Sequence, residues 1–182
     1  MTARRPFAMP FAPAASAEEE LVRSASQGDR AAFEELYNRN ARLVRAVLLA
    51  RVAIDHVEDL MQDVFIQAYR QLPRLRTPAA FRGWLMSIAR NRAAEHHRES
   101  RRNLALAPTR QPVTGHEEAV IILDAIRKLP EAYRETLILR LVEGMTGPEI
   151  ADRANLTPDS VRVNLSRGMK LLREKLTLGG RK

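Results

Sequence analysis

The sequence predicts an all-α protein made of two small helical domains joined by a flexible linker, the second domain containing a helix-turn-helix. Apolar residues recur at the i, i+3, i+4, i+7 spacing of a buried helix stripe, and no stretch alternates with the period of two that marks a strand. Between 101 and 116 this periodicity fails, and Pro108, Pro112 and Gly115 take its place. Beyond the break, a capping pattern and a turn signal mark two helices in close succession.

The first domain is expected at residues 18–100, after a disordered tail at 1–17. Its helices are expected over 18–27, 30–50, 57–72 and from 77 to about 100. The second and third of these carry apolar stripes that include Tyr37 and Tyr69. Thr77 and Pro78 fit the N-cap and first residue of the fourth helix.

The second domain is expected at 117–177, after a linker at 101–116. Pro130 restarts a helix that Gly144 ends. Thr146-Gly147-Pro148-Glu149 has the form of a capping box, in which the threonine hydroxyl and the glutamate carboxylate satisfy each other's backbone N–H groups. Asn155 tolerates the left-handed backbone of a tight turn, and Thr157 with Pro158 begins the next helix. Together these signals predict a helix-turn-helix.

Composition excludes several classes of protein. The 182 residues include no cysteine, so disulfides, thiol nucleophiles and cysteine-ligated metals are ruled out. No apolar run approaches the roughly 18 residues of a membrane span, so membrane insertion is not expected. Arg4 and Arg5 before an apolar stretch resemble a secretory signal, but three prolines interrupt it. A cytoplasmic location is therefore expected.

The net charge of +8 is concentrated in two segments. Residues 73–110 carry nine basic and two acidic side chains, and residues 151–182 carry eight and three. Each follows a segment with an acidic excess. This alternation indicates contact with a polyanion at two places, although a solvated helix face would explain either segment alone.

The outer face of the last helix has the composition of a DNA-reading surface, with cations and hydrogen-bonding groups on a helix slim enough for the major groove. Its candidate DNA contacts are Arg162, Asn164, Ser166, Arg167, Lys170 and Arg173.

Several ordered motifs resemble bacterial sigma factors of the extracytoplasmic-function group. They are Glu58-Asp59-Leu60-Met61-Gln62-Asp63-Val64-Phe65, Phe81-Arg82-Gly83-Trp84-Leu85, Ile88-Ala89-Arg90-Asn91, Leu129-Pro130, Glu143-Gly144 and Glu149-Ile150-Ala151. The resemblance implies a first domain like sigma region 2, which binds core RNA polymerase and opens the −10 element, and a second like region 4, which reads the −35 element. It implies no catalytic residue, cofactor or metal, and it implies an anti-sigma protein as a further partner.

An acidic face on the third helix is the candidate polymerase-binding surface, because carboxylates repel DNA but suit a basic protein. Its members are Asp55, Glu58, Asp59, Gln62 and Asp63. A plain solvated face is one alternative. An acid–base or metal site that adds His96 and His97 is another, but adjacent histidines on a helix point apart.

A cationic track is the candidate −10 surface, since single-strand binding needs positive charge along the backbone path. Its members are Arg74, Arg76, Arg82, Arg90, Asn91, Arg92, Arg98 and Arg101, and Arg102 continues the charge. The loop at 73–79 resembles the family's base-capturing loop. Phe81 and Trp84 share the stripe of Leu85, so we expect them in the core.

Two departures from the family pattern bear on promoter preference. Val163 and Asn164 follow Arg162 where the family often has serine and arginine, and Gly168 stands where alanine is common. Gly168 also lowers helix stability by about 0.8 to 1 kcal/mol relative to alanine. A stand-alone helix-turn-helix regulator remains an alternative function, and it would dimerise and bind a palindrome without polymerase.

Overall fold

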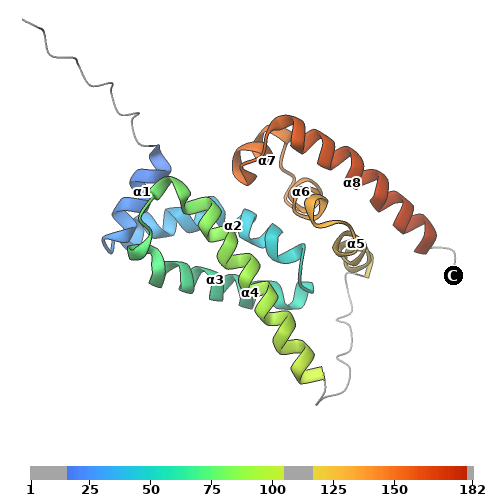
Figure 1. The fold of residues 1–182 in the computed structure, drawn as a ribbon, viewed down its shortest axis with the longest axis horizontal. Coiled ribbons are helices and arrows are strands. Elements are labelled where there is room, and N and C mark those ends of the chain that lie inside the picture. The colour runs from blue at the N-terminus through green and yellow to red at the C-terminus, as the bar shows by residue number, and fades with distance from the viewer. Residues whose placement is uncertain (1–15, 105–116, 180–182) are drawn as a thin grey trace, which may run out of the picture.

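The computed structural model describes residues 16–104 and 117–179, and all regular structure within these two stretches is helical (Figure 1). The elements are α1 (Ala17–Ser26), α2 (Arg30–Leu49), η1 (Ile54–His56), α3 (Val57–Gln71), η2 (Leu72–Arg74), η3 (Pro78–Ala80), α4 (Phe81–Leu104), α5 (Glu117–Arg127), α6 (Glu131–Leu141), α7 (Gly147–Ala154) and α8 (Pro158–Gly179). The all-α prediction is confirmed. Residues 1–15 of the expected tail and 105–116 of the expected linker lie outside the described residues. The edges of both segments belong to helices instead, because Ser16 caps α1, Ala17 begins it, and residues 101–104 continue α4.

Helices α1 to α4 form the first group, in which α2, α3 and α4 pack on one another and α1 lies along α2. Leu36, Val44, Val64 and Leu85 are fully buried where these helices meet. Ser16 and Asp29 cap α1 and α2 by accepting hydrogen bonds from backbone N–H groups of the first turn. Phe81 is buried with this core and Trp84 packs against it, as their shared stripe predicts.

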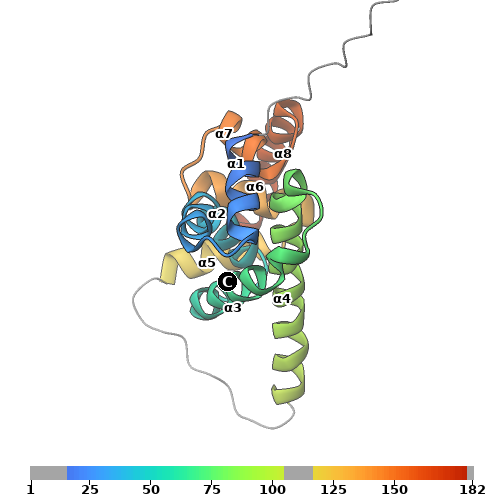
Figure 2. The ribbon, with the colours of Figure 1, turned by 90° about the vertical axis from the view of Figure 1, so that its left-hand side faces the viewer.

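The start of the fourth helix differs from the prediction. Pro78 opens a separate 3-10 turn, and α4 begins only at Phe81. The Thr77 hydroxyl makes no cap; its carbonyl instead accepts from the Ala80 N–H at 3.0 Å. Such tight turns are frequent at helix N-termini because they satisfy otherwise free N–H groups. At its other end α4 extends past residue 100, beyond the helices packed around its first half (Figures 1 and 2).

Helices α5 to α8 form the second group, in which α8 packs across α5, α6 and α7. The capping box is present: the Glu149 carboxylate accepts from the Thr146 N–H at 2.7 Å, and the Thr146 hydroxyl accepts from the Glu149 N–H. The Thr146 N–H and the Thr146 hydroxyl both donate to the Glu149 carboxylate, and these two hydrogen bonds lower the pKa of Glu149. Asn155 adopts φ 53°, and the Thr157 hydroxyl accepts from the Ser160 N–H at 3.1 Å. The predicted helix-turn-helix is therefore confirmed as α7 and α8.

Gly168 lies where α8 crosses α6. A Cβ at this position would stand 3.1 Å from the Tyr133 Cβ and 3.0 Å from the Leu137 Cδ1. The glycine thus permits a close approach of the two helices, which offsets its low helix propensity.

Candidate nucleic-acid and protein interfaces

The acidic face of α3 has an exposed part and a paired part. Asp55, Glu58, Asp59 and Gln62 are exposed, and Glu58 forms an ion pair with Arg45 of α2 at 3.2 Å. Asp63 is half-buried, and its carboxylate accepts two hydrogen bonds from Arg92 of α4, at 2.6 and 3.0 Å. The hydrogen bonds that Arg92 donates to Asp63 raise the pKa of Arg92 against the opposing effect of desolvation. The fold therefore joins a candidate polymerase contact to a candidate DNA contact.

The candidate −10 residues also divide into two sets. One set is exposed, along the approach to α4 and on its outer side: Arg74, Arg76, Asn91, Arg98 and Arg101. The other set forms ion pairs. Arg82 pairs with Glu18 of α1 at 3.0 Å and with Asp152 of α7 at 3.4 Å, and Arg90 pairs with Glu135 of α6 at 3.0 Å. Arg92, paired with Asp63, belongs to this second set.

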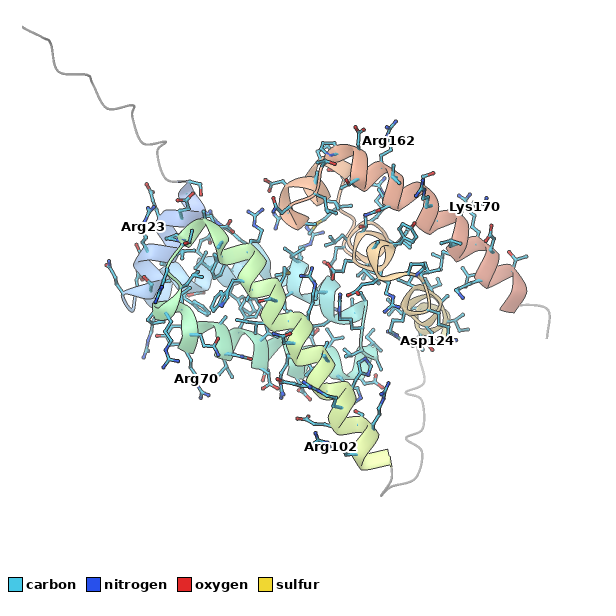
Figure 3. The ribbon with its side chains drawn as sticks, viewed as in Figure 1. Arg23, Arg70, Arg102, Asp124, Arg162 and Lys170 are labelled. Carbon is cyan, nitrogen blue, oxygen red and sulfur yellow. The ribbon has the colours of Figure 1, made fainter. Side chains whose placement is uncertain are left out.

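The candidate −35 residues lie on α8 and are not all on one face. Arg162, Ser166, Arg167, Lys170 and Arg173 are exposed. Arg162 and Lys170 point outward, away from α6 (Figure 3). Asn164 is half-buried instead, and it lines a cavity together with Arg90, Glu135 and Leu156. At about 100° per residue, Asn164 lies roughly 160° around the helix from Arg162, which explains the separation.

Two family models match the chain: sigma-70 region 2 over residues 36–103 and sigma-70 region 4 over residues 119–172. The sigma factor CarQ of Myxococcus xanthus is 32% identical, covering 82% of this chain and 91% of CarQ. NccH of Alcaligenes xylosoxydans xylosoxydans is 31% identical, covering 89% and 94%, and the sigma-E factor of Haemophilus influenzae is 28% identical, covering 87% and 95%. The chain belongs to the sigma-70 family, in its extracytoplasmic-function group.

Solved structures share the fold of this sigma factor. CnrH, solved in complex with the cytosolic domain of CnrY, matches with a TM-score of 0.60 at 24% identity, covering 88% of this chain and 97% of CnrH. The sigma factor RpoE of Bartonella quintana, solved with the anti-sigma factor NepR, matches with a TM-score of 0.51 at 21% identity, covering 80% and 96%. Sigma factors of this family direct promoter-specific transcription initiation by RNA polymerase.

The sequence did not predict an exposed aromatic surface that α2 and the C-terminal end of α3 form in this sigma factor. Tyr37 and Tyr69, expected in buried stripes, are 40% and 38% exposed. They line an open cavity of about 330 Å³ with Phe33, whose ring meets that of Tyr69 edge-on at 4.9 Å. Both tyrosines lie at the margin of their stripes, where a one-dimensional pattern does not distinguish core from surface. Ile66 lies outside the apolar stripe of α3, and an apolar residue in that position could have indicated an exposed apolar surface. In the structure its side chain is 49% exposed.

The structure offers no support for the acid–base or metal alternative. In the described stretches of the sigma factor, no three acidic or histidine side chains are grouped as metal ligands would be. The ring of His96 contacts that of His56 in a tilted arrangement with centroids 4.4 Å apart, and burial lowers the pKa of His96. His97 instead contacts the Arg51 carbonyl at 2.8 Å. None of the helices in these stretches is both long enough and apolar enough to span a membrane.

Proposed function

We propose that residues 18–100 of this sigma factor bind polymerase and recognise the −10 element, and that residues 117–177 recognise the −35 element. The segment 101–116 connects them, and its first four residues continue α4. The observation that carries the proposal is that the first group exposes charged surfaces of both signs. Asp55, Glu58, Asp59 and Gln62 are exposed at the start of the third helix, and exposed cations lie at Arg74, Arg76, Arg98 and Arg101. A surface of each sign suits a protein partner and a nucleic acid respectively.

The second group supports −35 reading through the exposed cationic face of α8. Arg162, Ser166, Lys170 and Arg173 fall within about 80° of the helix circumference, a width that fits the major groove. Arg167 lies at the margin of this face, and Asn164 lies outside it. We therefore keep Arg167 among the base-reading candidates, whereas Asn164 would reach DNA only if the two helical groups separated.

In this proposal the sigma factor carries no catalytic residue, needs no cofactor and acts in the cytoplasm, where the polymerase performs the chemistry. An anti-sigma protein is a further proposed partner. Two proteins of the same fold support this, because RpoE was solved with the anti-sigma factor NepR and CnrH with the cytosolic domain of CnrY.

The test is reconstitution with core RNA polymerase on a library of promoter fragments. We expect transcripts from a subset that shares one upstream and one downstream element. The rival, a stand-alone helix-turn-helix regulator, would instead dimerise and bind palindromic duplex DNA without polymerase. Such binding, with no polymerase-dependent transcript, would contradict the proposal.

A further inference from the structure

The two helical groups are joined by arginine–carboxylate contacts between α2 or α4 and α6. Arg51, at the end of α2, lies between two carboxylates of α6, with nitrogen–oxygen distances of 2.5 Å to Glu131 and 2.7 Å to Glu135. Arg90 of α4 donates two hydrogen bonds to Glu135, at 3.0 and 3.1 Å. We call these four side chains the latch.

The centre of the latch is shielded from solvent, whereas its outer members Glu131 and Arg90 are 70% and 44% exposed. The side chain of Arg51 is 12% exposed and that of Glu135 is 19% exposed, so their attraction is screened less than that of a surface ion pair. Burial raises the pKa of Glu135, but the hydrogen bonds and charges of Arg90 and Arg51 outweigh it and lower that pKa. Glu135 is therefore held as a carboxylate between two guanidinium groups.

Further contacts across the same boundary repeat this pattern. Arg42 of α2 pairs with Glu143 at 3.1 Å, and Arg82 of α4 donates to the Asp152 carbonyl at 2.7 Å. In these two pairs the first group supplies the arginine and the second group supplies the oxygen. Two backbone contacts run the other way, because Arg127 donates to the Val52 carbonyl at 2.9 Å and Arg153 donates to the Arg39 carbonyl at 2.6 Å. Helix α6 lies between α2 and α8, so the second group presents its acidic side to the first and its cationic α8 face to solvent (Figure 1).

Oxygen atoms of the second group contact arginines that we propose to bind DNA phosphates. Arg82 and Arg90 belong to the proposed −10 surface, and a guanidinium that grips a carboxylate with two hydrogen bonds grips a phosphate in the same way. Asn164 of α8 faces the cavity at this boundary as well. Contact between the two groups therefore covers part of the proposed −10 surface, while Arg162 and Lys170 remain exposed.

We propose that the second helical group is an intramolecular inhibitor, in which Glu135 takes the place of a DNA phosphate on Arg90, and Glu131 helps to hold the two groups together through Arg51, until the groups separate. The inference rests on the proposed function, because it requires that Arg90 and Arg82 face promoter DNA. Its partner chemistry is a single-stranded polyanion, which competes with the α6 carboxylates for the same guanidinium groups.

The test measures separation and DNA affinity in the full chain without polymerase. Because the sequence has no cysteine, Ser24→Cys in α1 and Lys175→Cys in α8 accept a donor and an acceptor dye at defined places. Glu135→Gln removes the central charge of the latch at nearly constant size. We expect lower energy transfer and roughly tenfold tighter binding of single-stranded oligo(dT), within the usual range for coupled sites.

Glu174→Gln is the matched control, since it removes the same charge from an exposed position beside the cations of α8. A general electrostatic effect would raise its affinity for oligo(dT) as much as that of Glu135→Gln, and that outcome would overturn the inference. Arg51→Gln opens the latch from the other side without touching a proposed DNA contact, so it serves if Glu135→Gln fails to fold.

Two further outcomes would overturn the inference. Unchanged energy transfer in both latch variants would mean that the latch does not hold the groups together. Lower energy transfer with unchanged DNA affinity would mean that closure does not compete with DNA. Promoter-specific transcription by the unmodified protein, measured in parallel with core polymerase, tests the proposed function separately, so failure of one does not count as failure of the other.

Discussion

Asp59 and Asp63 lie one helical turn apart on α3, but they have different surroundings. Asp59 is exposed, whereas Asp63 holds Arg92 of the neighbouring helix. A charge change at Asp63 would therefore disturb both the packing of α4 and the outer surface, and its effect on binding would be hard to separate from its effect on the fold. Asp59 is the cleaner position at which to test polymerase binding.

We predict that Asp59→Lys lowers affinity for core polymerase at least tenfold while changing the free energy of unfolding by less than about 0.5 kcal/mol, because exposed charges contribute little to stability. Pull-down titration and urea denaturation measure the two quantities. Glu20→Lys, an equal charge change at an exposed position of α1, is the control. Equal core affinity of Asp59→Lys and the unmodified protein would remove Asp59 from the interface.

On α8, Arg167 and Lys170 are both exposed cations, and we predict different roles for them. Arg167→Ala should flatten base preference at one or two positions of the upstream element, since a bidentate arginine–guanine contact gives about 1 to 3 kcal/mol of discrimination. Lys170→Ala should weaken all promoters alike and reduce the salt dependence of binding by about one unit of slope.

A promoter library with randomised upstream elements, read out by transcription with polymerase, distinguishes these two roles. The Lys170→Ala protein is the control for lost charge. If the Arg167→Ala protein keeps its base preference and only binds more weakly, Arg167 contacts phosphate and the base-reading assignment passes to the Arg162 side of the helix.

At the scale of elements, the turn between α7 and α8 depends on one backbone conformation. Asn155 has φ 53°, and the Leu156 N–H that follows it donates to the Ala151 carbonyl at 3.0 Å. We predict that Asn155→Val lowers the free energy of unfolding by about 1 to 2 kcal/mol, because a β-branched side chain opposes the left-handed region. Asn155→Gly should be nearly neutral, since glycine adopts this region freely. Urea denaturation compares them, and equal stability of both variants would contradict the strain argument.

The helices were predictable wherever their signals are local. The capping residues Thr146 and Thr157, and the apolar period of α3, act within one turn or one helix. The start of α4 was not predictable in this way, because the packing of the preceding loop decides whether Pro78 joins the helix or a separate 3-10 turn. The exposure of Tyr37 and Tyr69 was also missed, since it depends on where the neighbouring helices end.

At the scale of the whole molecule, the sequence indicated the charged surfaces but not their pairing. The acidic excess of 111–150 and the basic excess of 73–110 are visible in composition. That Glu135 meets Arg90 and Arg51 requires α6 to lie against α2 and α4, and no local pattern encodes that placement. For the same reason the sequence places Arg82 and Arg90 with Arg74 and Arg76, although in the described part of the chain Arg82 and Arg90 form ion pairs and Arg74 and Arg76 are exposed.

The latch should make the arrangement of the two groups depend on pH. The pKa of Glu135 is lowered from its ordinary value of 4.5 in the closed state, so its contribution to closure is fully present above pH 4.5 and is lost as pH falls through the lowered pKa. We predict that energy transfer between dyes at positions 24 and 175 decreases as the pH falls below 4.5. Circular dichroism at each pH shows whether the helices remain folded.

In the Glu135→Gln protein, which has no proton to gain at this position, energy transfer should begin low and change less with pH. An equal decrease in both proteins would mean that other carboxylates control the separation, and Glu143, paired with Arg42 across the same boundary, would be the next to replace.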